Sequence, residues 1–337
     1  MATVLPLFDL GRAPTTRDVA KLVKAGGLEA LPDARRRGDA ATYQEIRCRS
    51  ALNRVKGKAY MQWSLNPYRG CTHGCHYCFA RRYHSHLELD AGDQFASVIF
   101  VKINFVEVLR RELARPAWNK ESAGFGTATD PYQPIEGTYK ISRGVLEALR
   151  DFSSPVGIVT KGPMIVRDID VLVEAARRAS VSVTFSIPTL DEEVWRKTEP
   201  STAHPRQRLK AVSKLVDAGI KTGVGMAPIL PGISDRAEQL REVVKAAREA
   251  GATGVWTNLL FLRPGTREHF LEHLAEDWPE LVPKYRELYS SRAYLGADDV
   301  KPVKRRVAAL ARELGVADRR VRPVEPEAEP EQLALAV

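Results

Sequence analysis

Short runs rich in β-branched residues alternate with amphipathic runs along most of this 337-residue chain. The β-rich runs predict strands at residues 98–104, 123–129, 156–161, 181–187, 222–228 and 254–260. Helical periodicity follows at residues 105–114, 142–152, 166–179, 205–219 and 234–251. Strands that alternate with helices pair in parallel through right-handed crossovers. The pattern therefore predicts an α/β fold, and it fits an open doubly wound sheet or a barrel equally well.

The two ends of the chain depart from this alternation. Residues 1–55 are predicted to be an N-terminal extension with one short helix, which begins after Thr15 and ends at Gly26 and Gly27. Residues 266–322 are predicted to be a C-terminal helical segment. Residues 323–337 (PVEPEAEPEQLALAV) are acidic and alternate proline with glutamate, which favours a disordered tail.

Three cysteines form a tight C-x3-C-x2-C run, Cys71, Cys75 and Cys78. Thiolates this close repel one another unless a metal neutralises them. A four-iron cluster normally takes four cysteines, so three would leave one iron free for another ligand. The alternative is a zinc site completed by His73 or His76, although structural zinc sites usually pair two separate ligand hairpins. The pattern favours an iron–sulfur cluster.

The cysteine run, with Tyr77 just before its last member, resembles the signature of the radical S-adenosylmethionine (SAM) superfamily. The segments NPYRGC (66–71) and TDPYQP (129–134) are similar to the branch related to spore photoproduct lyase. The resemblance spans residues 57–265 and implies a partial (β/α)6 barrel of the TIM type as the core, residues 56–265. It also implies a [4Fe–4S] cluster whose fourth iron chelates SAM. Reductive cleavage of SAM would then give a 5′-deoxyadenosyl radical, which abstracts hydrogen from a substrate.

Several polar residues follow the predicted strands, where barrel enzymes place their chemistry. The resemblance implies that Cys71, Cys75 and Cys78 hold three irons. It also places Asp130, Gln133 and Glu136 near the SAM amino group. The glycine-rich, acidic motif that is usual there is not present literally in this sequence.

Four further residues are candidate SAM contacts. Lys161 would bind the SAM carboxylate or a substrate phosphate as a point charge, and Ser186 would bind the ribose hydroxyls. Tyr77 and Pro228, the latter in the segment PILPG, would lie against the adenine. The alternative for each is an ordinary core or strand-end residue.

One departure from spore photoproduct lyase limits the substrate prediction. That enzyme uses a cysteine near the strand that here reads 126–130, but this chain has no cysteine after Cys78 and carries Thr127 in the region. A hydroxyl is a poor hydrogen-atom donor, so lyase activity on thymine photoproducts is not expected. Cys48 lies between Arg47 and Arg49 and is either a reactive thiol or an incidental one.

Net charge and composition limit the classes of partner and the compartment that we expect. The net charge is +9, with basic residues gathered towards both ends, which attracts phosphate-bearing partners such as nucleic acid or merely solvates a surface. A non-catalytic zinc protein that binds nucleic acid is thus the competing hypothesis. No apolar run is long enough to span a membrane and no secretory signal is evident, so we expect a cytoplasmic protein reduced by a flavodoxin or a ferredoxin.

A second short motif occurs outside the predicted barrel. Residues 269–273 (HFLEH) match the H-x-x-E-H pattern of inverted zinc peptidases. The surrounding sequence reads as an exposed amphipathic helix, so the match is interpreted as fortuitous.

Overall fold

The computed structural model describes residues 13–28, 35–36, 41–57 and 61–316. The predicted tail, 323–337, lies outside these ranges. Helix α1 (Thr16–Gly26) begins after the cap residue Thr15, whose hydroxyl accepts a hydrogen bond from the backbone N–H of Asp18, as the sequence predicts. None of the described helices is long and apolar enough to cross a membrane.

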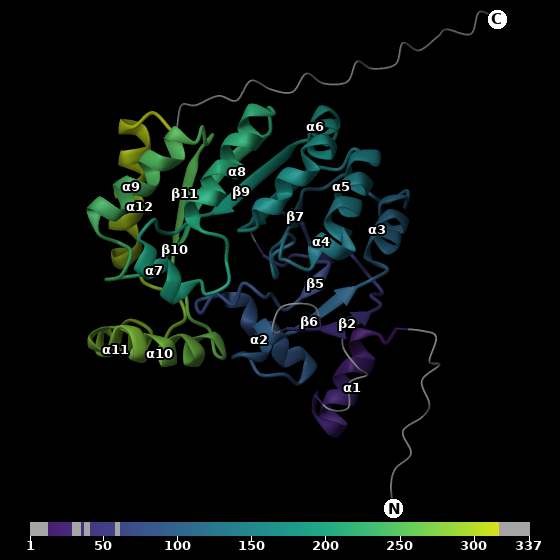
Figure 1. Cartoon of the computed structure of the whole chain (residues 1–337), viewed down its shortest axis with the longest axis horizontal. Coiled ribbons are helices and arrows are strands. Elements are labelled where there is room, and N and C mark those ends of the chain that lie inside the picture. Colours follow the sequence, from purple (N-terminus) through teal and green to yellow (C-terminus); the bar gives the residue numbers. More distant parts are fainter. Residues whose placement is uncertain (1–12, 29–34, 37–40, 58–60, 317–337) are drawn as a thin grey trace, which may run out of the picture.

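Six parallel strands form the centre of the molecule (Figure 1). Each lies beside the next along the chain, and the antiparallel strand β3 (Asn53–Arg54) closes one edge. The parallel strands are β4 (Trp63–Leu65), β7 (Ala123–Phe125), β8 (Val156–Thr160), β9 (Val181–Ser186), β10 (Lys221–Ile229) and β11 (Val255–Leu259). This order is that of the predicted partial barrel, and it brings the carboxyl ends of all six strands to the same side.

One predicted barrel strand lies elsewhere. Residues 98–104 form β6 (Val98–Lys102), which belongs to a second sheet with the order β1-β2-β6-β5. Its neighbours there are β2 (Thr42–Ile46), which is parallel to it, and β5 (Tyr68–Arg69), which is antiparallel, while β1 (Arg35–Arg36) forms the edge. The assignment of β6 to the barrel was therefore wrong, and β4 takes its place. The described part of the N-terminal extension also contributes strands β1, β2 and β3, which sequence periodicity did not reveal.

Helices cover the outer face of the parallel sheet (Figure 1). The predicted ones are α3 (Phe105–Leu113), α5 (Ile141–Asp151), α6 (Ile169–Arg178), α8 (Pro205–Asp217) and α9 (Ala237–Glu249). Shorter helices are η3 (Pro163–Asp168), α4 (Glu136–Tyr139) and α7 (Glu192–Thr198). The last described helix, α12 (Ala297–Glu313), packs on α9 and β11, and its buried side chains join the apolar core of the sheet. The boundary placed at residue 265 stays a prediction.

A second apolar cluster lies beyond the carboxyl ends of β10 and β11. Helices α10 (Thr266–Asp277) and α11 (Val282–Leu288), joined by η4 (Pro279–Leu281), pack there with Cys75 and Tyr77. The segment after the cysteines forms η2 (Phe79–Leu87) and α2 (Gln94–Ser97), and η2 contacts α10. Helices α10 and α11 thus pack against the cysteine loop and the segment that follows it.

Candidate functional site

The cysteine loop closes over the carboxyl ends of the parallel strands. Cys71, Cys75 and Cys78 all line one cavity of about 230 Å³. Gly70 and Gly74 frame the loop and adopt φ values of 80° and 64°, which a side chain would strain. At Gly70 a Cβ would also lie only 2.8 Å from the carbonyl oxygen of a β6 residue. The backbone of the cysteine loop therefore turns tightly enough for all three thiols to face the same cavity.

Buried polar side chains hold this loop in place. Arg81 is 1% exposed and donates hydrogen bonds to the carbonyl oxygens of Cys75 (2.9 Å), Gly74 (2.5 Å) and Gly92 (2.7 Å). From the barrel side, Gln133 accepts a hydrogen bond from the backbone N–H of Thr72 at 3.1 Å. The loop is therefore fixed before any ligand binds, which lowers the entropy cost of binding one.

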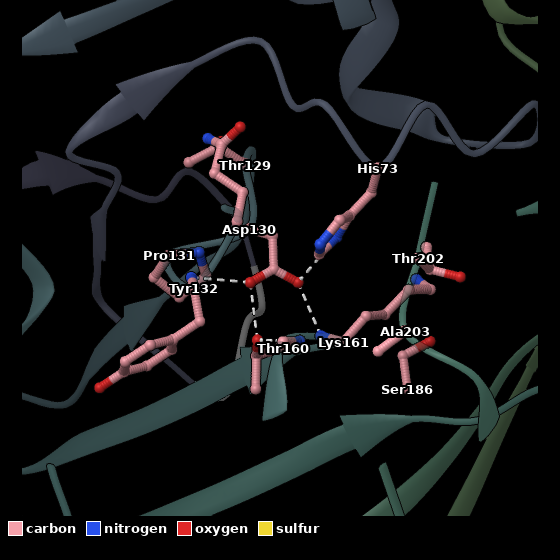
Figure 2. A network of polar contacts seen from close by, with 12 residues as sticks. His73, Thr129, Asp130, Pro131, Tyr132, Thr160, Lys161, Ser186, Thr202 and Ala203 are labelled. Atoms are coloured by element: carbon pink, nitrogen blue, oxygen red, sulfur yellow. Dashed lines mark hydrogen bonds and ion pairs between the residues drawn. The ribbon is translucent and has the colours of Figure 1, made fainter. Parts of the chain in front are cut away.

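Asp130 is the centre of a hydrogen-bond network at the end of β7 (Figure 2). Its carboxylate accepts from the Thr160 hydroxyl (2.6 Å), from the Lys161 backbone N–H (2.6 Å) and from the Tyr132 backbone N–H (2.8 Å), and it pairs with His73 Nδ1 at 3.3 Å. Burial alone would raise the pKa of Asp130, but the charge of His73 and these hydrogen bonds lower it to about 2. Asp130 is thus a fixed negative charge beside the cysteine loop.

Lys161 is the cation that faces the cysteines. Its ammonium lies 5.5 Å from the centre of the Tyr77 ring. Burial lowers the pKa of Lys161, but the nearby Cys75 and Glu199 outweigh burial and raise it. Lys161 is therefore a permanent positive charge at the cavity wall.

Behind Tyr77 lies a buried ion pair that the sequence did not reveal. The Tyr77 hydroxyl donates to Glu199, and Glu199 pairs with Arg208, which is fully buried. Arg208 also donates to the carbonyl oxygen of Ser186 at 2.9 Å. Arg208 lies on the buried face of its helix with Ala211, Val212 and Leu215, where an arginine is unexpected.

The opposite wall of the cavity comes from β9, β10 and β11. Ser186 and Pro228 line it, and the Ser186 hydroxyl donates to the carbonyl oxygen of Ala227 at 3.0 Å. The wall also contains Trp256 and Asn258, which sequence reasoning missed because β11 looked like an ordinary final strand. Trp256 is 46% exposed despite its size, which is unusual for a strand tryptophan in a closed core.

Two of the predicted site residues do not reach this cavity. Glu136 is fully buried and accepts hydrogen bonds from the Tyr68 hydroxyl (2.5 Å), the Ser142 backbone N–H (3.0 Å) and Arg167 (2.9 Å). Gln133 is also fully buried and contacts the loop backbone instead of the cavity. Gln133 lies in the turn segment after β7 and Glu136 is the first residue of α4, and both side chains point into the core. The expectation that they contact a bound ligand directly is corrected to a supporting position.

The positions of His73 and His76 restrict which histidine could complete a zinc site on the three cysteines. His76 points towards α10, with Nδ1 at 3.1 Å from His269 Nε2, and does not line the cavity. His73 does line it and interacts with both Cys71 and Asp130. A fourth zinc ligand from this loop would therefore have to be His73.

The thiols themselves indicate what the cavity can hold. Burial raises the pKa of Cys75 and of Cys78, since thiolates are poorly solvated there and repel one another. Only a bound cation would make three thiolates stable at this position. The donor set thus fits an iron–sulfur cluster.

Cys48 does not behave as a reactive thiol. It is 9% exposed, packs in the main apolar core, and its pKa is raised by burial. Its backbone is paired with the Asn104 side chain in both directions. The interpretation of an incidental cysteine is the one the structure supports.

A second cavity of about 620 Å³ continues from the first. The two share Phe79, Thr127 and Ala128 among their lining residues. The second cavity is lined by cationic side chains, and no carboxylate lines it among the described residues. The cations are Arg54, Lys56, Arg69, Lys102 and Arg263.

Comparison with known proteins agrees with this geometry. Residues 65–241 match the Radical SAM superfamily. An uncharacterized protein of Mycobacterium tuberculosis (strain ATCC 25618 / H37Rv) is 41% identical over 293 residues, which is 86% of each chain. A protein of Pseudomonas phage M6 named radical SAM Nalpha-GlyT isomerase is 27% identical over 169 residues, covering 50% of this chain and 33% of its own.

Solved structures of spore photoproduct lyase share the fold. The enzyme complexed with dinucleoside spore photoproduct has a TM-score of 0.64 at 16% identity, covering 82% of this chain and 81% of that one. A mutant of it with bound AdoMet and the same photoproduct has a TM-score of 0.65 at 15% identity, covering 90% and 93%.

The fold and site define an α/β enzyme of the kind that binds SAM and an iron–sulfur cluster. The chain belongs to the radical SAM superfamily.

Proposed function

We propose that the protein holds a [4Fe–4S] cluster on Cys71, Cys75 and Cys78 and cleaves SAM reductively to begin hydrogen abstraction from a nucleic acid. The observation that carries the first half is that all three cysteines line one cavity together with Lys161 and Asp130. When bound, the reduced cluster and SAM would supply a 5′-deoxyadenosyl radical. A flavodoxin or ferredoxin is the proposed reductant and the cytoplasm the proposed compartment.

The cavity walls offer a complementary charge for each end of SAM. Lys161 would pair with the carboxylate, and Asp130 would accept from the ammonium. Tyr77, Pro228 and Trp256 provide apolar surface for the adenine. Ser186 would contact the ribose, and Gln133 and Glu136 would fix the loop and strand end behind these groups.

The second cavity supports a nucleic-acid substrate. Its five cationic side chains suit a phosphate backbone. Arg69 Nη1 is buried there without a hydrogen-bond partner. Lys102 is half-buried nearby, its ammonium donates to the Asn66 carbonyl oxygen at 2.6 Å, and desolvation with the adjacent Arg69 lowers its pKa to about 8. An anionic ligand would relieve both costs.

A row of aromatic side chains borders these cations. Phe261 stacks on Tyr294 with ring centres 4.9 Å apart and lies 5.6 Å from Phe79, and Phe79 meets Tyr83 at 6.4 Å. Phe79, Tyr83 and Tyr294 are 37%, 38% and 50% exposed. Exposed rings beside a basic groove stack unpaired bases in proteins that bind single strands. We therefore propose that an unpaired base is presented to the SAM cavity at Phe79.

Thr127 lines both cavities and exchanges hydrogen bonds with Asn66. Among the described residues, none of those that line both cavities is a cysteine. For this reason repair of thymine photoproducts is not the proposed reaction.

Metal and sulfide analysis tests the cluster. Protein purified without oxygen should contain about four irons and four sulfides per chain, and Cys75→Ala should lose most of both. A colourless protein with one zinc would instead support the zinc alternative through His73.

Binding of single-stranded DNA across a range of salt concentrations tests the substrate class. Loss of each phosphate contact lowers the slope of log K against log salt by about 0.7. Arg54→Gln with Lys56→Gln should therefore lower it by about 1.4. The matched control, Lys304→Gln with Arg305→Gln on exposed positions of α12, should leave the slope unchanged. Equal effects of both pairs would contradict a specific groove.

A further inference from the structure

Three histidines converge on the outer side of the cysteine loop, away from the SAM cavity. His76 comes from the loop itself, and His269 and His273 lie one turn apart on α10. One ring nitrogen from each of the three lies within 4.8 Å of the others. The histidines therefore tie two segments that are distant in sequence, the loop and α10, which also packs against η2.

Their spacing is that of metal ligands. A tetrahedral zinc with Zn–N bonds of about 2.05 Å holds its ligand nitrogens about 3.3 Å apart. His76 Nδ1 and His269 Nε2 are 3.1 Å apart, and one ring nitrogen of His273 lies within 4.8 Å of the ligand nitrogens of both. A hydrogen bond between two imidazoles would account for the first distance. It gives no reason for a third imidazole to crowd the same point.

A neighbouring carboxylate orients one of the rings. Glu276 Oε2 lies 3.2 Å from His273 Nδ1. Metal-binding histidines usually give their second ring nitrogen to a carboxylate or carbonyl in this way, which leaves the other nitrogen for the metal. The guanidinium of Arg81, which lies near these histidines, directs its N–H groups to backbone carbonyl oxygens.

We propose that His76, His269 and His273 together bind one divalent transition-metal ion, such as Zn²⁺. This site is separate from the cysteine-bound cluster. Three imidazoles leave a fourth position for water. The ion would fasten the cysteine loop to α10. This assigns a role to the motif HFLEH that needs no peptidase chemistry, because the third ligand is His76 of the cysteine loop.

Zinc binding to protein that cannot form the cluster tests the proposal directly. In a variant with Cys71→Ala, Cys75→Ala and Cys78→Ala, titration with Zn²⁺ should fill about one site per chain. Adding His269→Ala and His273→Ala should abolish that site, while the control His86→Ala, an exposed histidine on η2, should keep it. Because the cysteines are absent, this result is independent of SAM cleavage and of the zinc alternative at His73.

A milder variant guards against misfolding of the histidine mutants. Glu276→Gln keeps all three ligands and should weaken Zn²⁺ binding about 10-fold. The proposal would be overturned if the cysteine-free protein bound no zinc at a Kd below about 10 μM. It would also be overturned if removal of His269 and His273 left the stoichiometry at one in protein whose circular dichroism is unchanged.

Discussion

Arg208 is expected to be a large single contributor to the stability of the site. Its side chain is fully buried, donates to the carbonyl oxygens of Ser186 (2.9 Å) and Ala203 (2.8 Å), and pairs with Glu199, which is 1% exposed. Arg208→Met would remove the charge that stabilises Glu199 and leave a buried carboxylate unpaired. Breaking a buried pair in this way costs about 3–5 kcal/mol.

The corresponding shift in melting temperature can be estimated from chain length. An unfolding entropy of about 2.1 cal/mol/K per residue over 337 residues gives about 0.7 kcal/mol/K. Arg208→Met should therefore lower the Tm of the metal-free protein by about 4–7 °C. Removing the orphaned charge as well, with Glu199→Gln, should recover part of this loss.

Thermal unfolding followed by circular dichroism measures the effect. Arg206→Met is the matched control, because Arg206 is exposed on the same helix two residues earlier, and its Tm should move by less than about 1 °C. A Tm for Arg208→Met within 1 °C of the unaltered protein would refute the claim that this pair is buried and paired.

Three further predictions concern individual side chains. Lys161→Met should weaken SAM binding to cluster-loaded protein by about 10-fold or more in anaerobic calorimetry, because a charged hydrogen bond is lost, and an unchanged Kd would contradict its role. Asp130 has a folded pKa of about 2, below its ordinary 3.8, so its stabilisation is complete above about pH 4 and is lost as pH falls towards 2. Asp130→Asn should therefore cost about 2 kcal/mol in urea unfolding at pH 7, and this difference should vanish near pH 2; a gap that persists there would argue against the ion pair. Cys48 is buried, so it should react slowly with iodoacetamide, and Cys48→Ala should leave 5′-deoxyadenosine formation unchanged; rapid labelling or lost activity would show that this thiol reaches the site.

The arrangement of strands and helices was largely predictable because local hydrophobic periodicity identifies each βα unit. The one misplaced strand, β6, is apolar on both faces, and apolarity does not identify the neighbouring strand. Its partner β2 lies in the N-terminal region, where weak patterning hid a strand. Pairing between distant segments is a property of the whole fold.

The site followed a similar rule. Asp130 and Lys161, which the sequence placed at or just after predicted strand ends, both line the cavity, and their contact with SAM stays a prediction. Gln133 and Glu136 do not line the cavity, because their side chains are buried and accept hydrogen bonds from the backbone of Thr72 and of Ser142. Arg208 is 47 residues after Lys161, so the sequence does not place it near the cavity. Its pairing with Glu199 has no local sequence signal except a charged residue on an apolar helix face.

Three cysteines share one cavity with the residues proposed to contact SAM. Anaerobic reconstitution with iron and sulfide, followed by SAM and dithionite, tests the proposed function through the yield of 5′-deoxyadenosine. We predict formation of 5′-deoxyadenosine by the unaltered protein and none by Cys75→Ala. Equal yields from both proteins, or no product from protein that carries its full cluster, would contradict it.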